Sequence, residues 1–161
     1  MQTRVPLPAL VVRLAALGDI LRTIPAVRLL KSGLPQLQIR WVVDDRWSMI
    51  LEGLPELEGR IQFPRKALQQ RGALRNLLGL PQTVAGLRRE LRQPRAALLL
   101  DFHGNLRSGL IGLLSGSPVR LGHDGAQQKE GNRWLTTNRV AARDRRTPRS
   151  RMRDRASVRR G

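Results

Sequence analysis

The sequence predicts an α/β fold in which an open parallel sheet carries helices on both faces. Short aliphatic runs alternate along the chain with segments whose apolar residues recur at helical spacing. The clearest example is residues 10–26, where an apolar run changes to helical spacing at Leu17-Gly18-Asp19. Parallel strands joined by helices need right-handed crossovers, and these cover both faces of the sheet. A chain of 161 residues is long enough for one such domain.

The expected elements follow one another along the first 122 residues. Strands are expected at the aliphatic runs 10–14, 39–43, 60–63, 97–101 and 119–122. Helices are expected between them, at 19–30, 47–53, 84–91 and 106–115. Between residues 64 and 80 the periodicity weakens, and this stretch is interpreted either as a solvated loop or as an anion-binding loop.

The charge is distributed unevenly. Residues 139–161 contain 10 of the 30 basic residues and have no apolar periodicity, so we expect a folded domain over 1–138 and a disordered arginine-rich tail over 139–161. The chain has three Trp, two Phe and no Tyr, which disfavours a platform that stacks single-stranded bases. No specific nucleic-acid partner is therefore expected, although a basic nucleic-acid-binding protein remains the weaker alternative. A basic surface also suits a phosphorylated substrate or an anionic membrane.

Several function classes are disfavoured by missing motifs. There is no cysteine, no GxGxxG, no phosphate-loop lysine motif, no GxSxG and no histidine pair at metal-ligand spacing. Most dehydrogenases, NTPases, hydrolases and zinc enzymes are thereby excluded, and no metal or cofactor is expected. Arginines and prolines interrupt the N-terminal apolar stretch, so it does not have the composition of a signal-peptide core, and we expect a cytoplasmic protein.

Two strand-to-helix junctions carry the candidate functional residues. At the first, Gly18 allows a sharp turn, and Asp19 can cap the helix, present its carboxylate to a ligand, or do both. At the second, Asp101 either fixes its loop by accepting backbone N–H groups or faces a ligand, and His103 is either a ligand donor or a loop histidine. Since parallel strands share one carboxyl edge, Asp19 and Asp101 are expected to lie at the same edge.

A third stretch follows the last expected strand. Lys129 and two arginines, Arg120 and Arg133, lie among glycines there. Cations and backbone amides in such a setting hold phosphate groups, and a charged surface loop is the alternative.

Together these stretches resemble the heptosyltransferases of glycosyltransferase family 9, which build the inner core of lipopolysaccharide. The matching motifs occur in the family's order over about residues 9–138. They are Leu17-Gly18-Asp19 with Thr23-Ile24-Pro25-Ala26, Trp41-Val42-Val43-Asp44-Asp45, the leucine-proline stretch 51–57, Phe63-Pro64-Arg65, residues 101–108, and Lys129-Glu130-Gly131-Asn132.

The resemblance implies a transferase with two Rossmann-like domains that moves a heptose from ADP-heptose to a lipid A-linked acceptor sugar. The N-terminal domain of such an enzyme holds the acceptor and the C-terminal domain holds the nucleotide sugar. By match to the motifs, Asp19 is the expected general base, which an attacking hydroxyl needs within hydrogen-bond reach. The expected acceptor-binding residues are Gly18, Arg65, Lys66, Asp101, His103 and Lys129, with the basic ones placed against phosphates and carboxylates.

Two departures from the family pattern are visible. Lys129 stands where many relatives carry arginine, which removes bidentate recognition of an oxyanion. The chain also has no expected nucleotide-sugar domain and continues instead into its arginine-rich tail. The tail resembles a reading frame translated out of register, with the break expected between residue 139 and about residue 149. We therefore expect a chain that is inactive alone, with a non-catalytic acceptor-binding remnant as the alternative. A peripheral contact with the inner membrane is a further expectation.

Overall fold

The computed structural model describes residues 5–65, 73–124 and 137–141, and it confirms the predicted α/β fold. Six parallel strands form one sheet in the order β3-β2-β1-β4-β5-β6. The elements are, in chain order, β1 (Leu7–Val12), α1 (Leu17–Gly33), β2 (Leu37–Asp44), the 3-10 helix η1 (Ser48–Leu51), β3 (Leu57–Phe63), α3 (Ala73–Arg92), β4 (Leu98–Asp101), α4 (Leu106–Ser115), β5 (Val119–Asp124) and β6 (Asn138–Ala141).

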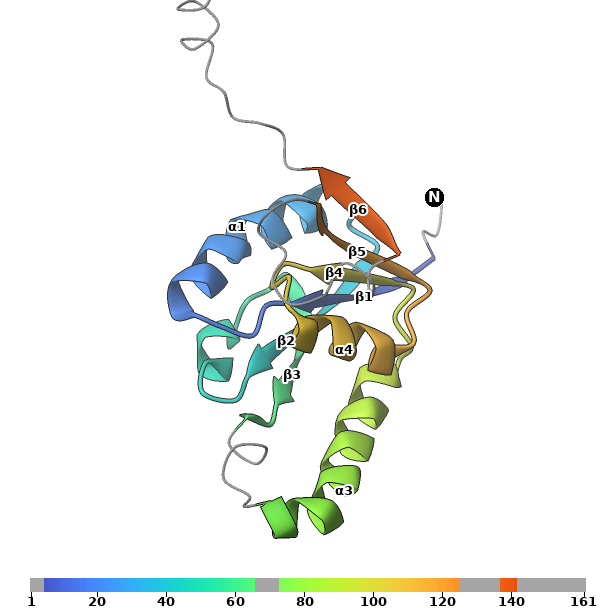
Figure 1. Cartoon of the computed structure of the whole chain (residues 1–161). Coiled ribbons are helices and arrows are strands. Elements are labelled where there is room, and N and C mark those ends of the chain that lie inside the picture. Colours follow the sequence, from blue (N-terminus) through green and yellow to red (C-terminus); the bar gives the residue numbers. More distant parts are fainter. Residues whose placement is uncertain (1–4, 66–72, 125–136, 142–161) are drawn as a thin grey trace, which may run out of the picture.

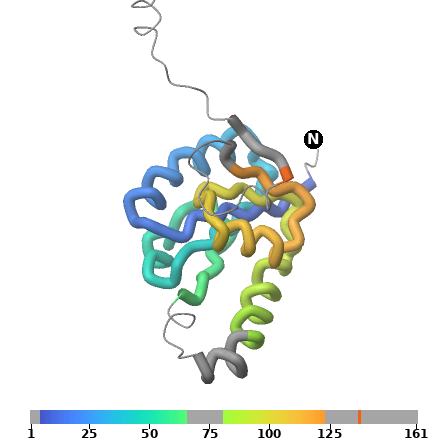
Figure 2. The backbone as a smooth tube through the Cα atoms, viewed as in Figure 1, coloured from blue at the N-terminus to red at the C-terminus, as the bar shows by residue number. Residues whose placement is uncertain are grey.

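Helices cover both faces of the sheet, as Figures 1 and 2 show. The side chains of β1 alternate between two buried cores because successive residues of a strand point to opposite faces. Leu10 and Val12 belong to the core under α3 and α4, with members such as Leu91 and Ile111. Ala9 and Val11 belong to the core under α1, with members such as Ile20, Val27 and Trp41. The continuous aliphatic runs of the sequence are therefore explained by burial on two sides.

The order of the strands in the sheet reverses between β1 and β4, because the chain crosses from β3 back to the other side of β1. From β1 the sheet extends through β2 to β3 on one side and through β4 to β6 on the other. Val12 at the end of β1 is aligned with Asp101 at the end of β4. Ligands of open α/β sheets bind outside the carboxyl ends of the strands at such a switch point, which makes this edge the candidate site.

Several predicted strand and helix ends are shifted by a few residues, and three predictions differ from the structure in kind. The helix predicted at 47–53 is only the single 3-10 turn η1. The stretch 64–80, predicted as a loop, contributes residues 73–80 to α3, whose composition of alanine, leucine and arginine favours a helix although Pro81 lies inside it. The sheet continues to Ala141 through β6, beyond the domain end predicted at 138. Backbone pairing to the edge of β5 requires no apolar periodicity, so the sequence pattern gave no signal for β6. The rest of the predicted tail, residues 142–161, lies outside the described residues.

The end of α3 is held by a side chain from the neighbouring strand β2. Arg40 Nη1 donates to the carbonyls of Glu90 and Gln93, both at 2.8 Å, and Nη2 donates to the carbonyl of Pro94 at 2.6 Å. The last carbonyls of a helix have no partner within the helix. Arg40 therefore supplies the donors that end α3 and fix the turn into β4.

In the part of the chain that the structure describes, none of the helices combines the length and apolar character needed to cross a membrane.

Candidate functional site

Asp19 lies in the first turn of α1, at the switch point of the sheet. Its prediction as a helix cap is wrong: the N-cap is Ala16, which has extended backbone angles and no side chain able to accept a hydrogen bond. The carboxylate of Asp19 instead forms an ion pair through Oδ2 with Arg13 Nη2, and its Oδ1 lies 4.0 Å from Arg22 Nη1. The Asp19 side chain is 42% exposed, so a ligand at the crevice can reach it.

Gly18 does not make the turn that the sequence predicted for it. Its φ angle is not in the left-handed region, and the chain enters α1 through the extended Ala16. A Cβ atom at Gly18 would meet no other atom within 4 Å. The first turn of α1 therefore has open space beside its backbone at Gly18.

Arg13 joins the two strand-to-helix junctions. It follows β1, pairs with Asp19 through Nη2 and donates from Nη1 to the carbonyl oxygen of Phe102 directly after β4. Its side chain is 16% exposed, so these contacts are made in a mostly dehydrated position. Asp19 and Asp101 lie at the same edge of the sheet, as predicted, and a residue that the sequence analysis did not single out connects their loops.

Asp101 fixes the loop between β4 and α4. Its buried carboxylate accepts the backbone N–H groups of His103 and Gly104 at 2.9 Å on Oδ1, and the Ser108 hydroxyl at 2.8 Å on Oδ2. Asn105 and Ser108 form a reciprocal capping box that starts α4. These contacts match the loop-fixing interpretation of Asp101.

His103 stands between the charged groups of the site. Burial lowers the pKa of His103 below its ordinary value of 6.5, and the charge of Arg13 lowers this pKa further, against the opposing effect of Asp101. Among the described residues, the buried His103 Nδ1 has no hydrogen-bond partner. The imidazole is therefore held in its neutral form near pH 7, with one ring nitrogen unused by the fold.

A second charged cluster lies at the end of β2. The buried Asp44 accepts hydrogen bonds from the Arg46 backbone N–H and Nε, both at 3.2 Å, and from Arg65 Nη1 at 3.3 Å. Burial acts to raise the pKa of Asp44, but the hydrogen bonds, chiefly from Arg46, outweigh it and the pKa lies below its usual value. Asp44 therefore holds two arginines near the carboxyl edge, one of them the predicted anion-binding Arg65.

Of the other predicted basic residues, Lys66, Lys129 and Arg133 lie outside the described residues, and Arg120 lies in β5. Within those residues, no group of three or more His, Asp or Glu side chains is gathered as metal ligands.

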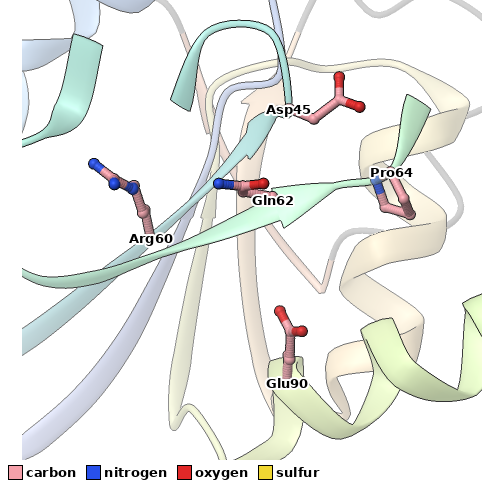
Figure 3. Close-up of a pocket in the computed structure, with 5 residues that line it drawn as sticks. All are labelled: Asp45, Arg60, Gln62, Pro64 and Glu90. Atoms are coloured by element: carbon pink, nitrogen blue, oxygen red, sulfur yellow. The ribbon is translucent and has the colours of Figure 1, made fainter. Parts of the chain in front are cut away.

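Sequence reasoning missed a polar cleft of about 450 Å³ beside the edge strand β3 (Figure 3). Its lining residues include Asp45, Arg60, Gln62, Pro64 and Glu90. They come from the turn after β2, from β3 and its end, and from α3, so no local motif marks them. The lining offers both donors and acceptors of hydrogen bonds.

Several solved heptosyltransferases share this arrangement of elements. Escherichia coli heptosyltransferase WaaC with ADP superposes with a TM-score of 0.68 at 19% identity, over 92% of this chain and 45% of that chain. WaaC with ADP-2-deoxy-2-fluoro heptose gives 0.72 at 18% identity, over 92% and 46%. E. coli ADP-heptose lps heptosyltransferase II gives 0.61 at 19% identity, over 85% and 35%.

The chain has the heptosyltransferase fold. A family 9 glycosyltransferase from Veillonella parvula also superposes, with a TM-score of 0.58 at 19% identity over 75% of this chain and 33% of that chain. Solved structures of the family suggested by the sequence motifs thus share this fold. The chain spans less than half the length of these proteins. No protein-family model matches the sequence, and no curated protein matches it.

Proposed function

We propose that this chain is the acceptor-binding half of a cytoplasmic sugar transferase that moves a heptose from ADP-heptose to a lipid A-linked acceptor sugar. The observation that carries the proposal is the exposed Asp19 carboxylate, held by Arg13 at the switch point of a sheet with the heptosyltransferase fold. The similar WaaC structures contain ADP and an ADP-heptose analogue, which supports an ADP-sugar donor. The donor is assigned to a second domain, since the chain spans less than half of those proteins.

In the proposed reaction Asp19 acts as the general base. It accepts the proton of the acceptor hydroxyl while the hydroxyl oxygen forms a bond to the anomeric carbon, and the bond from that carbon to the phosphate oxygen breaks to release ADP. Arg13 is a positioning residue because it holds Oδ2 and so fixes the orientation of the carboxylate. The step uses no covalent intermediate and no cofactor, and ADP-heptose enters as a substrate.

The basic residues near the carboxyl edge are assigned to the anionic groups of the acceptor. Arg65 is held by Asp44 and is 29% exposed, so its guanidinium is oriented while part of it remains accessible. Its Nε is buried without a partner among the described residues. An oriented guanidinium suits phosphate or carboxylate, which it binds through paired N–H groups. From the sequence motifs, Lys66 and Lys129 are proposed to bind the same anionic groups. The motifs also propose that Gly18, Asp101 and His103 help to form the acceptor site.

The test compares the chain alone with a fusion that adds the donor-binding half of a family 9 enzyme. The chain alone is expected to bind the lipid A-linked acceptor and to transfer no heptose, because positioning both reactants contributes about 7–11 kcal/mol to lowering such a barrier. The fusion is expected to transfer heptose. In the fusion, Asp19→Asn should lower turnover by about 10² to 10⁴ with acceptor affinity nearly unchanged, as for loss of a general base.

Glu58→Gln is the matched control, since it neutralises an exposed carboxylate on β3 that forms an ion pair with Lys31, away from the carboxyl edge. It should leave turnover unchanged. If Asp19→Asn also left the turnover of the fusion unchanged, Asp19 would be reduced to a structural partner of Arg13. Acceptor binding without transfer in the fusion would favour the non-catalytic acceptor-binding module.

A further inference from the structure

The outer face of α4 exposes a stripe of large apolar side chains. Leu106, Leu110 and Leu113 are 44%, 48% and 44% exposed. They lie at positions i, i+4 and i+7, so they follow one side of the helix. The opposite side is buried against the sheet through Ser108 and Ile111. This leucine stripe therefore faces away from both cores of the domain.

A groove of about 480 Å³ between α3 and α4 continues the leucine stripe. Leu114, one turn beyond Leu110, lies in its wall. The rest of the lining combines small apolar side chains with a basic rim: Pro81, Val84, Ala85, Arg88, Arg89, Arg92 and Gln93. Figures 1 and 2 show α3 and α4 on the same side of the sheet. Arg92 is fixed there because its Nε donates to the Leu114 carbonyl at 2.9 Å.

The surroundings of the stripe and the groove are strongly basic. Residues 73–120 contain seven arginines and two acidic residues. Of the two acids, Asp101 is buried and Glu90 lines the cleft beside β3. The leucines and arginines thus share a surface with little negative charge to neutralise it.

We propose that the leucine stripe and the adjoining basic groove form a docking surface for an anionic phospholipid bilayer. Exposed leucines along one side of a helix can enter the interfacial region of a bilayer, and arginines beside them bind lipid phosphates. A nucleic acid would use the arginines but not the leucines. A two-fold dimer through this face would place arginines against arginines, because such an interface pairs a patch with itself. The proposal is independent of sugar transfer.

The experiment measures binding of the full 161-residue chain to vesicles of equal parts phosphatidylglycerol and phosphatidylcholine by co-sedimentation. The double variant Leu110→Ser with Leu113→Ser keeps the net charge of +18, so any charge-driven binding elsewhere in the chain is unchanged. We expect its partition coefficient to fall about tenfold, from the loss of buried apolar area. Leu29→Ser is the matched control, since Leu29 is 74% exposed on α1, which covers the other face of the sheet.

A charge arm uses Arg88→Gln and its control Arg28→Gln, which remove one positive charge each from α3 and α1. We expect partition to fall about fivefold for Arg88→Gln, the effect of one cation near an anionic surface, and by much less for Arg28→Gln. Binding to pure phosphatidylcholine vesicles should be weak for every variant, because the anionic headgroups are then missing.

A second readout uses a label on the stripe in place of the double serine exchange. The chain has no cysteine, so Leu110→Cys gives one attachment point for an environment-sensitive fluorophore. Its emission should shift to the blue when anionic vesicles are added, and the same label at Leu29→Cys should not shift. Equal partition of the double leucine variant and the unaltered chain, or an unshifted label at position 110, would overturn the proposal. Self-association without vesicles that the leucine exchanges abolish would also overturn it, in favour of contact between copies.

Discussion

The sharpest test of the architecture at the carboxyl edge is the removal of the Asp101 carboxylate. This group is 4% exposed and accepts two backbone N–H groups and one hydroxyl from the loop that starts α4. Hydrogen bonds to a charged group contribute about 1.5–3 kcal/mol each. Since the three donors share one loop and can partly regain water, Asp101→Ala should lower the free energy of unfolding by about 3–5 kcal/mol, the range for breaking a buried charged network.

Asp101→Asn separates the charge from the shape of the side chain. It keeps one oxygen for the two N–H groups but presents an amide where Ser108 now donates. The expected loss is about 1–2 kcal/mol. Ser108→Ala should lose a similar amount because it leaves Oδ2 without this donor and breaks the capping box. In a double-mutant cycle the two exchanges should show a coupling of about 1 kcal/mol, since both residues belong to one network.

Urea unfolding followed by far-UV circular dichroism measures these changes as shifts of the midpoint at constant slope. Glu58→Gln is the control, because its ion pair with Lys31 is exposed and should contribute less than about 0.5 kcal/mol. The reasoning fails if Asp101→Ala is as stable as the unaltered chain. It also fails if the Asp101 and Ser108 exchanges are strictly additive.

Two further predictions concern His103 and Arg40. Burial and the charge of Arg13 hold the pKa of His103 below 6.5, so below pH 6.5 the unfolded chain takes up a proton that the folded chain does not. This group should therefore not affect stability above pH 6.5, and the free energy of unfolding should fall as the pH drops below that value. In urea unfolding, His103→Gln should show a smaller fall than the unaltered chain. An equal fall in the variant and the unaltered chain would be the contrary result. Arg40→Ala should cost about 2–3 kcal/mol because it removes the Arg40 donors from the carbonyls of Gln93 and Pro94 and leaves the Glu90 carbonyl with the longer Gln93 N–H contact at 3.4 Å. Hydrogen exchange should rise in the last turn of α3, with Arg40→Lys intermediate, and unchanged protection in Arg40→Ala would contradict this role.

The candidate site could be predicted only in part. Sequence reasoning placed Asp19 and Asp101 at one edge and weighed the loop-fixing role that Asp101 performs. It did not find Arg13 as the link between the two junctions, because its partners are 6 and 89 positions away and no spacing rule joins them. It also expected Asp19 or Gly18 to shape the start of α1, whereas Ala16 enters the helix without a side-chain cap.

The sequence by itself determined the fold class, since aliphatic runs and helical periodicity record which faces of each element are buried, and burial dominates the free energy of folding. It also determined that Asp19 and Asp101 lie at the same edge of the sheet, because the carboxyl ends of parallel strands all lie at one edge. Only the tertiary structure decided which charges pair: Asp44 with Arg46 and Arg65, and Arg13 with Asp19. Whether near neighbours such as Arg13 and Asp19, or remote segments such as those lining the cleft beside β3, come within contact distance depends on the path of the folded chain, and local periodicity does not encode that path.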